Sequence, residues 1–113
     1  MKSYWIRPES GKTALELREA PVPEPGAGQL LVRMRAAGLN RGELIVGHSV
    51  KAGGAAKAAG AEGAGEVAKL GAGVTGFKTG ERVMGRCAGS FAEYSLMDAR
   101  EAQIGRASCR ERV

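Results

Sequence analysis

The sequence contains few aromatic residues, two cysteines and a single histidine, and each scarcity argues against a class of protein. Aromatic residues make up 4% of the 113 residues and no run of lysine and arginine occurs, so nucleic-acid binding has little support. Cys87 and Cys109 are too few for a disulfide framework or a zinc cluster. No apolar run approaches the ~20 residues of a membrane-spanning helix, and no signal peptide opens the chain. We therefore expect a cytoplasmic protein that binds neither nucleic acid nor membrane.

The C-terminal tail differs from the rest of the chain. Residues 104–113 read IGRASCRERV, a polar stretch without a period. In-frame translation of ATC GGA AGA GCG TCG TGT AGG GAA AGA GTG gives the same peptide, and this DNA resembles a common sequencing-library adaptor. A natural basic tail is the alternative. We expect a native domain over residues 1–102 and a non-native tail over 103–113 that is not part of the fold. The three arginines and one glutamate of residues 104–113 contribute +2, so the formal charge of +5 falls to +3.

Hydrophobic alternation predicts a mainly β protein. The alternating or β-prone segments are residues 2–7, 14–20, 29–38, 66–70, 81–84 and 90–97. In the third segment Val32, Met34 and Ala36 alternate with arginines, which predicts one buried and one wet face. In the last, Tyr94 and Leu96 lie opposite Ser95. Residues 21–26 contain three prolines and form an extended connector. No helix of ten or more residues separates the strands, so the pattern favours a barrel or sandwich over alternating strands and helices.

One short helix is predicted at residues 40–46. Asn40 is a good N-cap, and Glu43 stands three positions later, where its carboxylate can reach back to the cap. Gly47 would end the helix. Residues 47–59, which are rich in alanine and glycine, form a loop or a weak helix broken at its two central glycines.

The stretch GAGVTG at residues 71–76 matches the glycine pattern G-x-G-x-x-G of dinucleotide-binding sites. That pattern binds a pyrophosphate only where the glycines join a strand to a helix N-terminus. Here a further turn and strand follow Gly76, and no acidic residue ends a second parallel strand about 20 residues later. We therefore interpret these glycines as turn residues that need a positive φ.

Three stretches together carry a family resemblance: REAPVPEPGAGQLLVRMRAAGLNRGEL, GAEGAGEVAKLGAGVTGFKTGERVMG and GSFAEYSLMDA. The spacing G-x-E-x-x-G-x-V followed by G-x-x-V-x-x-F-x-x-G-[DE]-R-V resembles the N-terminal GroES-like domain of medium-chain dehydrogenase/reductases, from about residue 2 to residue 102. The resemblance implies a partly open barrel of short strands with one short helix. It also implies that this domain supplies much of an active-site cleft, while the nucleotide-binding glycines belong to a downstream Rossmann domain.

The resemblance also indicates a branch without zinc. Zinc-dependent relatives have a cysteine and a histidine where this sequence has Asn40 and Ala61, and neither an amide nor a methyl group replaces such a ligand. The cysteine-rich lobe that holds structural zinc is absent, and His48 is interpreted as a loop residue. Asparagine at the cysteine position is similar to the zinc-free quinone oxidoreductase and enoyl reductase branch.

The resemblance implies roles for a few side chains. Asn40 would lie beside the nicotinamide, where its amide can bind a carbonyl oxygen or the cofactor's carboxamide, in addition to capping a helix. Glu43 occupies the family's acidic position after asparagine, and its alternative role is the capping box. Glu62 is expected to be a buried structural acid behind the cleft. Cys87 is expected to be a small buried apolar residue rather than a nucleophile.

The implied activity is reduction of a quinone or conjugated carbonyl by NADPH or NADH without zinc, with a homo-oligomeric full-length protein. Two alternatives remain open: a free-standing GroES-like binding module, and a relative of the zinc alcohol dehydrogenases that has lost its ligands. The chain alone is expected to be inactive, because the strand–glycine–helix unit that holds a pyrophosphate is missing from it.

Overall fold

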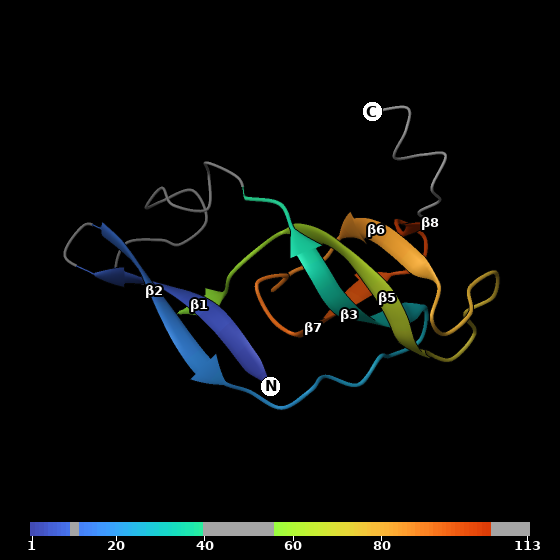
Figure 1. Cartoon of the computed structure of the whole chain (residues 1–113). Helices are drawn as coiled ribbons and strands as arrows, with labels where there is room; N and C mark the ends of the chain where they lie inside the picture. The colour runs from blue at the N-terminus through green and yellow to red at the C-terminus, as the bar shows by residue number, and fades with distance from the viewer. Residues whose placement is uncertain (10–11, 40–55, 105–113) are drawn as a thin grey trace.

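The computed structural model describes residues 1–9, 12–39 and 56–104, and within these ranges all regular structure is strand (Figure 1). The strands are β1 (Lys2–Glu9), β2 (Lys12–Glu19), β3 (Gln29–Ala37), β4 (Lys57–Ala58), β5 (Glu62–Leu70), β6 (Arg82–Arg86), β7 (Tyr94–Asp98) and β8 (Gln103–Ile104). The described ranges contain no helix long and apolar enough to cross a membrane. The predicted helix at residues 40–46 lies outside the described residues.

The strands form two antiparallel sheets, which confirms the mainly β, partly open architecture. One sheet has the order β2-β1-β4 and the other β7-β3-β5-β6-β8. The β1–β2 hairpin lies at one end of the molecule and β8 at the other (Figure 1). The sheets are joined where β1 meets the segment before β7: Tyr4 N donates to Phe91 O at 2.8 Å, and Ser3 forms a bridge with Ala92. This join fixes the hairpin against the larger sheet.

The main hydrophobic core lies within the five-stranded sheet. Its buried members come from four strands and the residue after β6: Leu30, Val32, Val67, Val83, Cys87 and Met97. A smaller cluster of Ile6 and Ala59, covered by Phe91, holds the three-stranded sheet to the rest. Burial of apolar side chains from strands distant in sequence therefore stabilises both sheets.

The alternation predicted for β3 holds from Val32 to Arg35 but fails at Ala36, which is exposed beyond a register shift, and that predicted for β7 is reversed. Val32 is buried while Arg33 and Arg35 are exposed. On β7 the buried residues are Ser95 and Met97 rather than the intervening residues. The register with β3 sets this side inward, since Ser95 stands opposite Val32 and Met97 opposite Leu30 of the core. Ser95 Oγ donates to the carbonyl of Ala88 at 3.0 Å, which satisfies the buried hydroxyl.

Strand β5 begins four residues earlier than the predicted segment 66–70, and the short strands β4 and β8 were not predicted. The glycines at 63 and 65 made residues 62–65 resemble a turn, but they pair with β3 and β6. Strand β8 pairs Ile104 with Val83 and Gln103 with Met84. Regular structure therefore extends into the first two residues of the tail predicted over residues 103–113.

The GAGVTG stretch forms a turn between β5 and the segment leading to β6, as predicted, but the positive φ expected of its glycines is wrong for Gly71. Gly73 and Gly76 have φ values of 75° and 84°. A Cβ at Gly71 would collide with the carbonyl oxygen of Gly26 and lie 2.7 Å from that of Gln29. Two of its amides are used, since Gly71 N donates to Gln29 O of β3 at 2.8 Å and Val74 N to Gly71 O at 3.3 Å. These two bonds engage the amides of Gly71 and Val74, and no helix of the described chain follows the turn to direct further amides at a phosphate.

Gly73 has a positive φ and open space around it, whereas Gly71 lies against backbone oxygens, so an added methyl group should cost different amounts at the two positions. Gly73→Ala places Cβ in open space and carries only the cost of a positive φ, about 1 kcal/mol. Gly71→Ala drives Cβ into backbone oxygens and should cost about 3 kcal/mol, at the upper end of overpacking. Urea unfolding of the two variants measures the difference. Equal losses would contradict the close approach of residues 26 and 71.

Candidate functional site

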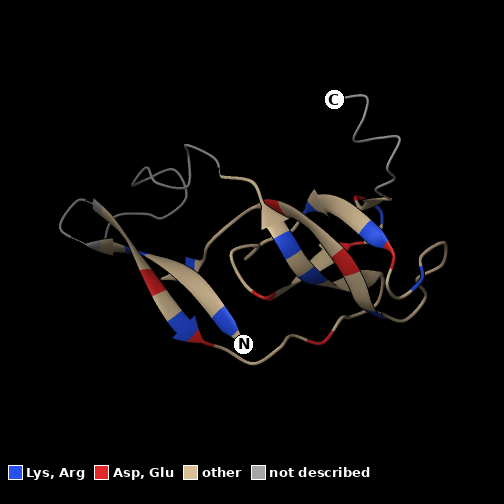
Figure 2. Ribbon diagram, in the orientation of Figure 1, with Lys and Arg blue, Asp and Glu red and all other residues tan. Residues whose placement is uncertain are grey.

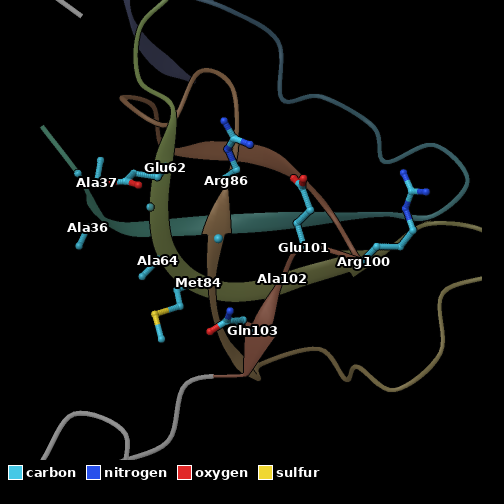
Figure 3. A pocket seen from close by; sticks show the side chains of 13 residues that line it. Ala36, Ala37, Glu62, Ala64, Met84, Arg86, Arg100, Glu101, Ala102 and Gln103 are labelled. Atoms are coloured by element: carbon cyan, nitrogen blue, oxygen red, sulfur yellow. The ribbon is translucent and has the colours of Figure 1, made fainter. Parts of the chain in front are cut away.

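The candidate site is a pocket of about 790 Å³ where the end of β3 meets the start of β5, the end of β6 and the segment around β8 (Figure 3). Four side chains supply its charge: Glu62, Arg86, Arg100 and Glu101. Its remaining lining is Ala36, Ala37, Gly38, Gly63, Ala64, Met84, Gly85, Ala102 and Gln103. Segments distant in the sequence thus form one concave surface, as is usual for ligand sites.

One wall of the pocket is a close contact between Gly38 and Glu62. The amide of Gly38 donates to the carbonyl oxygen of Glu62 at 3.1 Å. A Cβ at Gly38 would lie 2.8 Å from Cγ of Glu62 and 2.9 Å from its Cδ. The Glu62 side chain therefore lies over the bare backbone of Gly38, and it extends toward Ala37 in Figure 3. Any other residue at position 38 would displace this carboxylate.

The expected burial of Glu62 is wrong, because its side chain is exposed. Glu62 is the first residue of β5 and stands opposite Arg86, the last residue of β6. Both therefore lie at an open end of the sheet, where no further layer of the described chain covers them. The sequence shows that residue 62 is the acid of the family pattern, but it does not indicate whether other segments cover this end of the strand.

Cations and anions alternate around the pocket. Glu101 and Arg86 extend to the same side of it in Figure 3. The guanidinium of Arg100 donates to Asp98 at 2.9 Å and 3.2 Å. This hydrogen bond lowers the pKa of the Asp98 carboxyl and raises that of Arg100. Both groups of this pair are solvent-exposed enough for water to screen the interaction, so the pair shapes the rim rather than stabilising the fold.

The wet face of the large sheet carries a separate set of charges. Arg35 on β3 donates to Glu66 on β5 at 2.7 Å (Figure 2). Lys69 on the same strand bonds Glu24 of the proline-rich connector, also at 2.7 Å. These pairs are exposed and contribute little stability. The Lys69–Glu24 pair does, however, link the connector to β5.

The predicted residues Asn40 and Glu43, together with His48, lie outside the described residues, so their roles stay predictions. The last described residue before them is Leu39, whose side chain is 74% exposed. Gly38, which lines the pocket, is two residues from Asn40, a distance that the backbone spans in at most about 7 Å. Arg86, Glu101 and Gln103 were not identified from the sequence, since only the pairing of β6 with β8 brings them to the pocket.

Cys87 is buried in the main core, as predicted. Its Sγ contacts the carbonyl of Gly85 at 3.8 Å, and burial raises the pKa of the thiol. A raised pKa leaves less thiolate at neutral pH, so the environment does not activate Cys87 as a nucleophile. Within residues 1–9, 12–39 and 56–104, no three histidine, cysteine or acidic side chains lie close enough together to hold a metal ion.

Residues 26–105 match the family described as Alcohol dehydrogenase GroES-like domain. Prostaglandin reductase-3 of Bos taurus is 42% identical over 91 residues, which cover 75% of this chain and 23% of that protein. Solved structures give further similarities. A mycobacterial protein in complex with NADPH superposes with a TM-score of 0.79 at 25% identity, covering 95% of this chain and 34% of that one.

The quinone oxidoreductase of Pseudomonas syringae superposes with a TM-score of 0.78 at 27% identity, covering 96% of this chain and 34% of that one. A cobalt- and zinc-bound alcohol dehydrogenase of Pyrobaculum aerophilum gives the same TM-score at 28% identity, covering 95% of this chain and 42% of that one. The chain therefore spans less than half the length of each of these proteins. It belongs to the family of alcohol dehydrogenase GroES-like domains, the N-terminal domain of medium-chain oxidoreductases.

Proposed function

We propose that this chain is the N-terminal catalytic domain of a zinc-independent NAD(P)H-dependent reductase acting on a quinone or conjugated carbonyl. The observation that carries the proposal is the likeness to the Pseudomonas syringae quinone oxidoreductase, combined with asparagine and alanine at the family's two zinc-ligand positions. The NADPH of the mycobacterial neighbour supports a nicotinamide cofactor. A cytoplasmic homo-oligomer with a small-molecule substrate and no nucleic-acid or membrane partner completes the proposal.

The residues of this chain would position and polarise the acceptor. When bound, a reduced nicotinamide supplies the hydride. Asn40 donates an amide hydrogen bond to the acceptor's carbonyl oxygen, and this bond strengthens as negative charge develops there. Glu43, three residues after Asn40, supplies the acidic side chain beside this amide. The pocket that begins at Gly38 then receives the body of the acceptor, where the small side chains of β3 and β5 leave room for a flat ring.

Metal independence is directly testable. Dialysis of the full-length enzyme against a strong chelator should leave its reductase activity unchanged, because an amide at residue 40 and a methyl group at residue 61 cannot ligate zinc. The zinc-bound neighbour makes this a necessary experiment. Activity that falls on dialysis and returns with added zinc would assign the protein to the zinc-dependent branch.

Asn40 should show two separable roles. As a helix cap, Asn40→Ala should cost about 0.5–2 kcal/mol of unfolding free energy, while Asn40→Asp should retain stability. As a polarising group, both substitutions should lower kcat/KM of the full-length enzyme. Unfolding and steady-state assays on the same two variants separate the roles. Kinetics unchanged in both would leave only the cap.

The 113-residue chain alone should not bind the cofactor saturably. The amides of Gly71 and Val74 are already bonded to backbone oxygens, and the described residues offer no helix N-terminus for the pyrophosphate. Calorimetric titration of the purified chain with NADPH and NADH should therefore show no one-to-one complex. A micromolar complex with either cofactor would mean that the described glycines form a nucleotide site.

A further inference from the structure

Strand β2 has a free outer edge. It forms the end of the sheet β2-β1-β4, and no other described strand pairs with its outer side (Figure 1). It pairs with β1 over all 8 of its residues in an unbroken register. Proteins protect such edges with prolines, bulges, short strands or charges, and of these β2 has only charges. The arrangement of those charges therefore decides which strand can pair here.

The last pair of the hairpin shows which backbone groups of β2 face outward. Met1 N donates to Ala20 O at 2.7 Å, and Ala20 N donates to Met1 O at 2.9 Å. Opposite residues of an antiparallel pair alternate between hydrogen-bonded and non-hydrogen-bonded pairs. In the unbroken register the even-numbered residues of β2 therefore bond β1, and the amides and carbonyls of Leu15, Leu17 and Glu19 face the free edge. Within the described part of the chain, these three amides have no hydrogen-bond partner.

The charges favour one register for a second copy of the same strand. Two copies can pair antiparallel about a twofold axis that passes through any central residue of β2. An axis at Glu16 or at Arg18 places that charge opposite itself, and an axis at Leu15 leaves Glu16 opposite Ala14. An axis at Leu17 places Glu16 of each copy opposite Arg18 of the other, so that both charge pairs attract.

Both charged side chains already lie on the same side of β2 and remain partly exposed. Arg18 donates to Glu16 at 3.0 Å and lies over the ring of Trp5, 4.9 Å from its centroid. The hydrogen bond from Arg18 lowers the pKa of the Glu16 carboxyl, which stays ionised at neutral pH. The two side chains are 42% and 38% exposed, so each can also reach an opposite charge on a neighbouring strand.

The same register brings exposed apolar side chains together on the other side of β2. Leu17 is 53% exposed, and Tyr4, which stands opposite it on β1, is 46% exposed. About an axis at Leu17, the two Leu17 side chains lie opposite each other, and each has Tyr4 of its own copy on its far side. Cross-strand packing along this row adds to the backbone hydrogen bonds of the edge.

We propose that two copies of this chain form a symmetric dimer in which their β2 strands pair antiparallel about Leu17. The two sheets then join into one, of order β4-β1-β2-β2-β1-β4. Pro21 ends the ladder, because it falls opposite Thr13 and has no amide hydrogen to donate. The paired segment spans only residues 14–20, whereas a stable interface involves roughly 20–30 residues a side. The dimer is therefore weak, and it does not depend on the proposed reductase activity.

Sedimentation velocity of the 113-residue chain, with a thiol reductant present, tests the dimer. The chain should pass from monomer to dimer as its concentration rises, and no larger species should form, because a twofold contact closes. Leu17→Pro removes the outward amide at the axis and should abolish the dimer. Proline is tolerated on an edge strand where its nitrogen faces solvent, and the ladder to β1 uses the even-numbered residues. Urea unfolding of the same variant checks that the hairpin still folds.

Charge reversal tests the register. Glu16→Lys should weaken dimerisation about tenfold, because two attractive pairs become repulsive. The double variant Glu16→Lys with Arg18→Glu restores opposite charges between the copies and should restore the dimer. Val22→Lys is the control, since Val22 is a similarly exposed apolar residue outside the paired segment, and it should leave dimerisation unchanged.

Several results would overturn the proposal. A chain that stays monomeric at every concentration has no such contact, and a dimer that a folded Leu17→Pro variant retains uses another surface. A dimer that Glu16→Lys does not weaken, or that the double variant does not restore, pairs in another register or elsewhere. If Leu17→Pro does not fold, the two charge variants decide alone. None of these readouts is reductase activity, so failure of the proposed function leaves the test valid.

Discussion

The close approach of β3 and β5 is the constraint on which the rest of the structure depends. A Cβ at Gly65 would collide with the carbonyl oxygen of Arg33, and one at Gly63 would lie 2.7 Å from that of Ala36. The two strands can therefore pair over their full length only because these positions are glycine. This pairing carries the centre of the five-stranded sheet, with β7 on the outer side of β3 and β6 on the outer side of β5. It also brings Gly38 to Glu62, and so builds a wall of the pocket.

Irregular register within the same pair directs the end of β3. The pairing shifts between Leu31 and Val32 and again between Met34 and Ala36. Such bulges bend a strand and increase its twist. Beyond the second shift, Ala36 and Ala37 are exposed and line the pocket, whereas Leu30 and Val32 before it are in the core. One strand thus serves the core at its start and the candidate site at its end.

Much of the fold could be predicted from the sequence, because most strands carry their own alternation and turn residues. The failures share a physical cause: they occur where a distant partner decides the structure. Residues 62–65 have the glycines of a turn, but an approaching backbone makes them strand. Two-residue strands such as β8 have no period of their own and exist only through pairing. Burial on β7 was reversed because its register with β3 places Ser95 opposite Val32 and Met97 opposite Leu30.

The site was harder to predict than the fold for the same reason. Sequence motifs indicated Ala61 and Glu62, but Arg86 and Glu101 reach the pocket only through the order β5-β6-β8. Glu62 is exposed at the start of β5, whereas Leu15 and Leu17 are exposed in the middle of β2. A carboxylate can remain in water at no cost, whereas alternating leucines gain stability only by burial. The exposure of Glu62 therefore carries no cost in stability, whereas that of Leu15 and Leu17 forgoes the gain that burial gives.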